Sequence, residues 1–183
     1  MDILRAIITE TKTSGNPNEI FSELTEKYGN AVYKFCRSLT YSKEDAEDLF
    51  QETFLKIFEQ PHKIKDAENP RDFLFSTALY IWKNRQRKYA RRNRIAPIEP
   101  LDESVADNIN IEEEYAAREE IGIVRELVES LPEKLRIPVI LYYTVEMDVN
   151  EIASTLKIPA GTVKSRLFNA RKIIEKGLIE NEQ

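Results

Sequence analysis

The chain has almost none of the residues that build disulfides, metal centres or nucleophilic catalytic sites. Its 183 residues include one cysteine, Cys36, and one histidine, His62. A single cysteine cannot form an internal disulfide, and zinc in proteins is usually held by several Cys and His side chains. These counts argue against a zinc centre and against Cys-His or Ser-His-Asp catalysis, so we expect no cofactor and no enzymatic activity.

Long apolar runs and glycine are also scarce. The longest stretch without a charged residue extends only from Phe73 to Trp82, well short of the roughly 20 apolar residues that a membrane-spanning helix needs. The N-terminus lacks the basic-then-apolar order of a signal peptide, so we expect a cytoplasmic protein. With 42% hydrophobic and 32% charged residues but only 5 Gly, the composition is that of a globular, helix-rich chain.

Helical periodicity and helix-start signals predict seven helices. Asn69 as N-cap and Pro70 at the first helical position mark one start most clearly. The expected helices cover residues 18–40, 43–60, 70–93, 111–130, 132–145, 149–157 and 160–177, with a weaker helix within 1–17.

A segment between these helices has the composition of a linker. Residues 95–111 mix Pro, Asp, Asn and Ser without a sustained helical period. Val, Ile and Thr show no sustained alternation with polar residues over the length of a strand, so no sheet is expected. The sequence therefore predicts an all-α fold of two small helical domains, residues 1–95 and 113–183, joined by a flexible linker over 96–112.

Positive and negative charges are sorted along the chain, although the net charge is only −5. No acidic residue lies between Phe73 and Ile98, whereas seven basic residues cluster there: Lys83, Arg85, Arg87, Lys88, Arg91, Arg92 and Arg94. Nine acidic residues then follow within 99–120, against the single Arg118. The average charge argues against a general nucleic-acid coat, but the basic cluster indicates a local binding face.

The helix expected over 43–60 has one apolar side and one acidic side. Apolar residues at i, i+3, i+4 and i+7 spacing predict a buried stripe of Ala46, Leu49, Phe50, Thr53, Phe54, Ile57 and Phe58. The opposite side carries Glu44, Asp45, Asp48, Gln51 and Glu52. Such a face is either an ordinary solvated surface, with acids favouring the helix N-terminus, or a docking surface for a basic partner.

The helix expected over 70–93 combines aromatic, amide and cationic groups on one side. At 100° per residue this side contains Phe73, Thr77, Tyr80, Lys83, Asn84, Arg87, Lys88 and Arg91. Cations neutralise phosphates, an aromatic ring stacks on an unpaired base, and an amide bonds a base edge. A solvated basic helix would more often intersperse Glu, so the pattern favours a nucleic-acid surface.

Two short apolar stripes around a turn predict a helix-turn-helix. Ile152, Ala153 and Leu156 end the first helix, Ile158-Pro159 turn the chain, and a second stripe contains Val163, Leu167, Ala170 and Ile174. The outward residues are of types that read bases and bind phosphates: Lys164, Ser165, Arg166, Phe168, Asn169, Arg171 and Lys172. Two helices packed in an ordinary bundle are the alternative. A left-handed backbone at Lys157, where many such turns have Gly, would cost about 1 kcal/mol.

Three segments carry recognisable motifs in a fixed order. They are DAEDLFQETF at Asp45–Phe54, LPEKLR at Leu131–Arg136 and GTVKSRL at Gly161–Leu167. The first resembles the core-binding motif of region 2 in bacterial RNA polymerase sigma factors of the extracytoplasmic-function (ECF) group. The others resemble the start and the recognition helix of region 4. The similarity extends over residues 20–177.

The resemblance implies three binding sites and no catalysis. Contact with polymerase core falls to Asp45, Asp48, Leu49, Gln51 and Glu52. Recognition and melting of the minus-ten element fall to Lys63, Lys65, Phe73, Thr77, Tyr80, Lys83, Asn84, Arg87, Lys88 and Arg91. Recognition of the minus-35 element falls to Thr162, Lys164, Ser165, Arg166, Phe168, Asn169, Arg171 and Lys172.

The implied partners are promoter DNA and RNA polymerase core, through its β′ clamp helices and its β flap, with no small-molecule substrate. The linker would be threaded through polymerase. Whether an anti-sigma factor, a frequent partner in this family, binds the chain stays open. A stand-alone helix-turn-helix regulator would explain residues 149–177 but not the two charged helices, and a metal-dependent nuclease would need convergent carboxylates.

Overall fold

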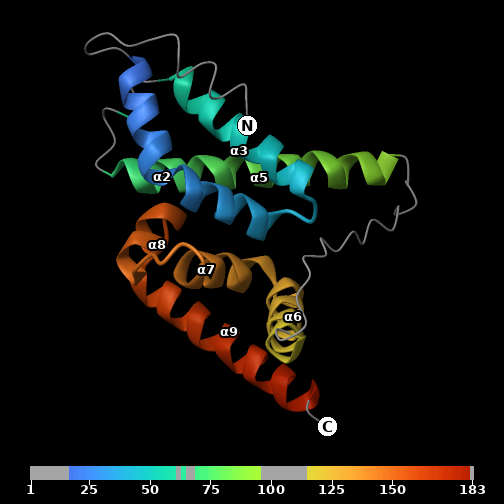
Figure 1. Cartoon of the computed structure of the whole chain (residues 1–183). Coiled ribbons are helices and arrows are strands. Elements are labelled where there is room, and N and C mark those ends of the chain that lie inside the picture. Colours follow the sequence, from blue (N-terminus) through green and yellow to red (C-terminus); the bar gives the residue numbers. More distant parts are fainter. Residues whose placement is uncertain (1–16, 61–62, 65–68, 96–114, 182–183) are drawn as a thin grey trace. The chain divides into compact units, whose positions relative to one another are not determined.

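The computed structural model describes residues 17–60, 63–64, 69–95 and 115–181. In these ranges the elements are α2 (Pro17–Leu39), α3 (Lys43–Phe58), α5 (Pro70–Ile95), α6 (Tyr115–Ser130), α7 (Glu133–Tyr143), α8 (Val149–Leu156) and α9 (Ala160–Asn181), with no strand (Figure 1). The all-α prediction is confirmed. The weak helix predicted within 1–17 and the start of the one predicted from 111 fall largely outside the described residues.

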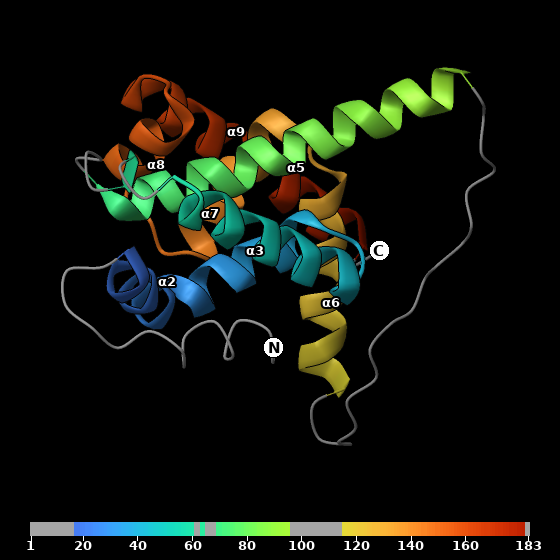
Figure 2. The ribbon, with the colours of Figure 1, turned by 90° about the horizontal axis from the view of Figure 1, so that it is seen from above.

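The chain divides into two compact units at residue 100. In the first unit, α3 packs against both α2 and α5, and α2 also contacts α5 (Figures 1 and 2). In the second unit, α9 packs against α6, α7 and α8. No helix in the described ranges is long and apolar enough to cross a bilayer.

The apolar stripe of α3 forms the middle of the first core. Ala46, Leu49, Thr53, Phe54 and Ile57 are buried, and the Thr53 hydroxyl donates a hydrogen bond to the carbonyl of Leu49 at 2.7 Å. The predicted stripe is confirmed for these five residues.

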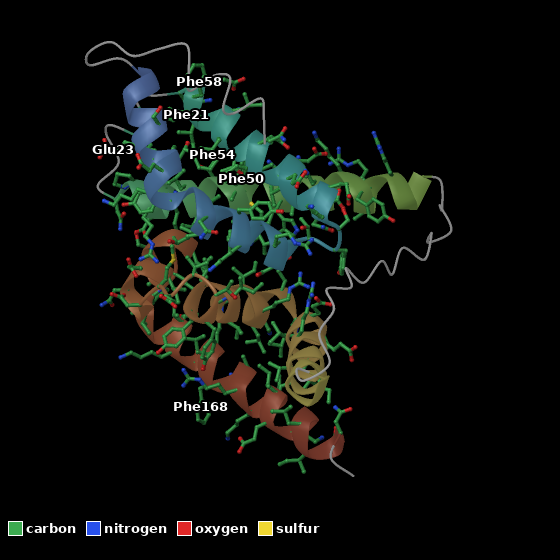
Figure 3. All side chains as sticks on the ribbon, in the orientation of Figure 1. Phe21, Glu23, Phe50, Phe54, Phe58 and Phe168 are labelled. Carbon is green, nitrogen blue, oxygen red and sulfur yellow. The ribbon has the colours of Figure 1, made fainter. Side chains whose placement is uncertain are left out.

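The two other aromatic residues of that stripe lie at its edge. The ring of Phe58 meets that of Phe21 on α2 edge-on, 5.5 Å between centroids, where the two helices come together (Figure 3). Phe58 nevertheless stays 38% exposed, and Phe50 is only half-buried. Their predicted full burial is therefore wrong, because α2 and α5 cover only part of the circumference of α3.

The buried side of α5 lies where the periodicity places it. Leu74, Ala78 and Ile81 are buried, and Trp82 is 4% exposed. The Asn69 side chain accepts a hydrogen bond from the backbone N–H of Arg71 at 2.9 Å, so the predicted N-cap is confirmed. Burial ends early on this helix: every side chain from 86 to 92 is exposed. The C-terminal end of α5 thus projects past α2 and α3 (Figures 1 and 2).

Cys36 is a core residue of the first unit. Its side chain is fully buried on α2, and burial raises the pKa of its thiol to about 12. Because the thiolate is the reactive form, this cysteine is unreactive at neutral pH.

The second core places α9 against the other helices of its unit. Val163, Leu167 and Ala170 are buried, as predicted, whereas Ile174, the last residue of the predicted stripe, is half-buried. On α8, Ile152 and Thr155 are buried, whereas Ala153 and Leu156, predicted to complete its apolar side, are half-buried. The prediction favoured the more apolar residues, but the position on the helix decides burial.

The turn between α8 and α9 has well-defined ends. Asp148 accepts hydrogen bonds from the backbone N–H groups of Asn150 and Glu151 at 2.7 and 2.9 Å. The Glu151 side chain accepts one in return from the Asp148 N–H at 2.8 Å, which completes a capping box. At the other end of α8, Lys157 has φ 54° and ψ 47°. The left-handed backbone anticipated at Lys157 is therefore present.

Replacing Lys157 with glycine should raise the free energy of unfolding by about 1 kcal/mol, because glycine has no Cβ to strain a left-handed backbone. The matched control is Lys157→Ala, which removes the same side chain but keeps the Cβ and should bring no comparable gain. Urea unfolding followed by circular dichroism measures both. Equal gains in the two variants would show that the lysine side chain, and not the backbone, causes the effect.

Candidate partner-binding and nucleic-acid surfaces

The first candidate surface is the acidic face of α3, which consists of Glu44, Asp45, Asp48, Gln51 and Glu52. The four carboxylates are exposed and Gln51 is half-buried. Ser42 caps the helix by accepting a hydrogen bond from the N–H of Asp45 at 3.0 Å. The core fixes the other side of α3, so these carboxylates point to solvent together.

Leu49, which the resemblance placed among the polymerase contacts, is not part of this face. Its side chain has no exposed surface and packs within the stripe. The assignment of Leu49 to a partner contact is therefore wrong for this structure, because a fully buried side chain cannot touch another protein. Leu49 instead holds the helix in place.

Leu55 is a surface residue that the expected sites leave out. It is 51% exposed, and it follows Asp48 and Gln51 by seven and four residues, which places it on the acidic face. An apolar centre with a charged rim is the usual composition of a protein interface. The sequence does contain a signal for it, since Leu55 is an apolar residue of this helix outside the predicted stripe.

Glu52 has a partner within the protein. Its Oε2 accepts hydrogen bonds from Nε and Nη2 of Arg85 at 2.9 and 2.6 Å. Arg85 comes from α5, so this ion pair joins the two charged helices. The Glu52 side chain remains 51% exposed and is still accessible to another molecule.

The second candidate surface is the basic-aromatic face of α5: Phe73, Thr77, Tyr80, Lys83, Asn84, Arg87, Lys88 and Arg91. Phe73, Thr77, Lys83 and Asn84 are half-buried, whereas Tyr80 is 60% exposed and Arg87, Lys88 and Arg91 are exposed. The Thr77 hydroxyl donates to the carbonyl of Phe73 at 2.7 Å. Before α5, Lys63 is exposed, and Lys65 lies outside the described residues.

The third candidate surface is the outward face of α9, where Lys164, Ser165, Phe168, Asn169 and Lys172 are exposed and Thr162 and Arg166 are half-buried. Phe168 lies on the outer side of the helix and is 55% exposed (Figure 3). The Lys172 ammonium is 4.6 Å from the centre of its ring. A cation and an aromatic ring therefore occupy the middle of this face together.

Arg171 contacts another helix of its own unit. Its Nε donates a hydrogen bond to the Tyr143 hydroxyl at 2.9 Å, and the guanidinium lies 5.7 Å from the ring centre of Tyr142. This hydrogen bond raises the pKa of Arg171 above its ordinary value. Arg171 therefore ties α9 to α7. Sequence periodicity could not reveal this contact, which joins residues 28 positions apart.

An exposed acidic helix, a projecting basic helix and a helix-turn-helix define an α-helical protein whose surfaces suit a protein partner and DNA. Family models match both units. Residues 24–92 match the model of sigma-70 region 2, and residues 121–174 match that of sigma-70, region 4.

Relatives with known names agree with these matches. The ECF RNA polymerase sigma-E factor of Salmonella typhimurium is 32% identical over 181 residues, which cover 92% of this chain and 91% of that protein. The ECF RNA polymerase sigma factor SigW of Bacillus subtilis is 26% identical over 167 residues, covering 87% and 89%. The sigma factor RpoE of Bartonella quintana, solved in complex with the anti-sigma factor NepR, has a similar fold. Its TM-score is 0.70 at 21% identity, and the match covers 87% of this chain and 97% of that one.

The chain therefore belongs to the sigma-70 family of RNA polymerase sigma factors, in the extracytoplasmic-function group. It binds RNA polymerase core and directs promoter-specific initiation of transcription. A stand-alone helix-turn-helix regulator is not favoured, because the region 2 match covers the unit that such a regulator would not need.

Proposed function

We propose that the acidic face of α3 docks this sigma factor on polymerase, and that the outward faces of α5 and α9 read the minus-ten and minus-35 elements. The observation that carries this proposal is the separation of charge within the first unit. One core exposes an acidic face on α3 and a basic-aromatic face on α5, so a basic protein partner and DNA have separate surfaces.

Docking uses both charge and apolar area. Asp45, Asp48, Gln51 and Glu52 face the β′ clamp helices, where opposite charges steer the encounter and set its orientation. Leu55 supplies an apolar centre that loses its water on contact.

Promoter melting uses the basic-aromatic face of α5. Arg87, Lys88 and Arg91, with Lys63 and Lys65 before the helix, neutralise phosphates. Tyr80 offers its ring to an unpaired base, which returns about 1–3 kcal/mol by stacking, and Asn84 can bond a base edge. Phe73, Thr77 and Lys83 are less exposed and border the contact.

Recognition of the minus-35 element places α9 in the major groove. Lys164, Arg166 and Lys172 contact phosphates, while Ser165 and Asn169 face the base edges. Phe168 suits contact with a thymine methyl group, and Thr162 lies at the start of the helix. Arg171 orients α9 through Tyr143 rather than reading bases, which revises its expected role.

The two DNA-binding faces act together only in the complex with polymerase. We assign region 2 to residues 1–95, a linker threaded through polymerase to 96–112, and region 4 with its β-flap contact to 113–183. A net charge of −5 repels free DNA, whereas docking brings both readers to the promoter at high effective concentration. The protein acts by binding, without catalysis of its own, in the cytoplasm.

Asp48→Arg should weaken binding to polymerase core by at least tenfold while leaving the fold intact, because the residue is exposed and exposed substitutions usually change stability by less than about 0.5 kcal/mol. The matched control is Glu23→Arg, the same change of charge on the exposed side of α2 (Figure 3). Titration with core, plus circular dichroism, measures both. Equal losses in the two variants would contradict a docking role for α3.

Tyr80→Ala should slow promoter opening more than it weakens closed-complex binding, because the ring acts on bases that are already unpaired. Tyr89→Ala removes an equally exposed tyrosine, 55% against 60%, from the opposite side of α5 and should leave opening unchanged. Permanganate footprinting detects the opening. A pre-melted bubble template should rescue Tyr80→Ala, and failure of that rescue would rule out the melting assignment.

Asn169→Ala should cost about 1–3 kcal/mol of holoenzyme binding on the preferred minus-35 element and much less on a scrambled one, because an amide can pair bidentately with adenine. Lys172→Ala should weaken both templates alike and reduce the salt slope by about one unit. Binding is measured over a salt series. If Asn169→Ala loses the same affinity on both templates, Asn169 positions the helix without reading sequence.

A further inference from the structure

The ion pair between Glu52 and Arg85 lies where α5 leaves the body of the first unit. Arg85 follows the buried residues Ile81 and Trp82 by four and three positions, so it continues the buried side of α5. Its own side chain is 35% exposed, and each side chain from 86 to 92 is exposed. Arg85 is therefore the last partly buried side chain among the described residues of α5. We call the projecting part beyond it, Gln86–Ile95, the arm.

The geometry of this ion pair fixes the orientation of the Arg85 guanidinium as well as its distance from the Glu52 carboxylate. Nε and Nη2 of Arg85 both donate to the same oxygen of Glu52, at 2.9 and 2.6 Å. A guanidinium that donates through two nitrogens is held in orientation, which a single bond from a lysine would not achieve. Glu52 is carried by α3, whose other side is fixed in the core.

The described side chains of the arm, residues 86–92, are exposed, so burial adds little to its stability. Arg87 and Arg91 are four residues apart, as are Lys88 and Arg92, and like charges at this spacing destabilise a helix. No acidic residue lies between Phe73 and Ile98, so the arm cannot form compensating pairs along its own surface. Most helical stability in proteins comes from tertiary packing, so a contact at the base of the exposed arm matters.

We propose that the Glu52–Arg85 ion pair anchors the arm and sets its direction, so that Glu52 is a positioning residue for promoter opening in addition to its polymerase contact. Only the promoter half of this inference rests on the proposed function. The Glu52 carboxylate serves both roles because its pairing with Arg85 leaves half of its side chain exposed.

The first experiment measures the arm in the free protein, without DNA or polymerase. A nitroxide label is attached at Ala90→Cys, an exposed arm position; the buried thiol of Cys36, with its pKa raised to about 12, is left unlabelled. Glu52→Gln and Arg85→Gln should each increase the nanosecond mobility of the label. Arg85→Glu should increase it most, and adding Glu52→Arg to it should restore the original mobility.

Two controls separate anchoring from general loosening of the fold. A label at Glu26→Cys on the exposed side of α2 should report no change in any variant. Glu44→Gln, which neutralises another acid of the same face, should leave the Ala90→Cys label as it was. Unchanged mobility at position 90 in Arg85→Gln would overturn the anchor, as would an equal change at position 26.

The second experiment measures promoter opening at saturating polymerase core. Glu52→Gln and Arg85→Gln should slow opening several-fold, and the charge-swapped pair should recover opening while its affinity for core stays weakened by Arg at position 52. If the label at position 90 has normal mobility in the charge-swapped pair but promoter opening does not recover, Arg85 acts on DNA directly. That result would overturn the positioning role. Increased mobility with normal opening would contradict the role of α5 in melting and leave the anchor itself supported.

Discussion

Burial of the apolar stripe of α3 between α2 and α5 is the constraint on which the first unit depends. Burying one Leu, Ile or Phe side chain stabilises a protein by about 1.5–3 kcal/mol, whereas an exposed ion pair contributes at most about 1 kcal/mol. The core of Leu49, Phe54 and Ile57 therefore decides the rotation of α3 about its axis. That rotation determines which carboxylates face solvent, and the same core orients Tyr80 away from it. Ion pairs such as Glu52–Arg85 adjust this arrangement but do not create it.

In the second unit, too, the buried side of a helix determines which residues face solvent. Val163, Leu167 and Ala170 fix which side of α9 is buried, and the capped start and left-handed end of α8 fix the turn that precedes it. The bond from Arg171 to Tyr143 adds a polar tie to α7. The outward residues of α9 thus stand on a helix whose position is specified before any DNA is bound, which lowers the cost of ordering on binding.

The sequence predicts the helices and their buried sides well. The spacing of apolar residues indicates which side of a helix faces the core, and capping residues indicate where the helix begins and ends. The sequence does not predict the burial of a side chain where that burial depends on how far a neighbouring helix extends. Phe58 falls on the apolar side of α3, yet α2 and α5 leave it 38% exposed, and Tyr89 continues the line of buried Trp82 but lies beyond the end of the core. The sequence does not predict the partners of Glu52 and Arg171 for the same reason, because both contacts join separate helices through tertiary packing. The buried Leu49 shows that a motif match assigns a segment to a role more reliably than each of its residues.

Separation of charge then explains why the protein acts through polymerase. Acidic and basic faces on one small unit cannot both bind DNA. In the proposed arrangement polymerase covers the acidic face, so promoter choice belongs to the complex. The most direct test is sequencing of transcript 5′ ends made in vitro by polymerase core, with and without this protein, on fragmented template DNA. We expect start sites that appear only with the protein and share two upstream elements at constant spacing. Identical start sites with core alone, or new starts without shared elements, would contradict it.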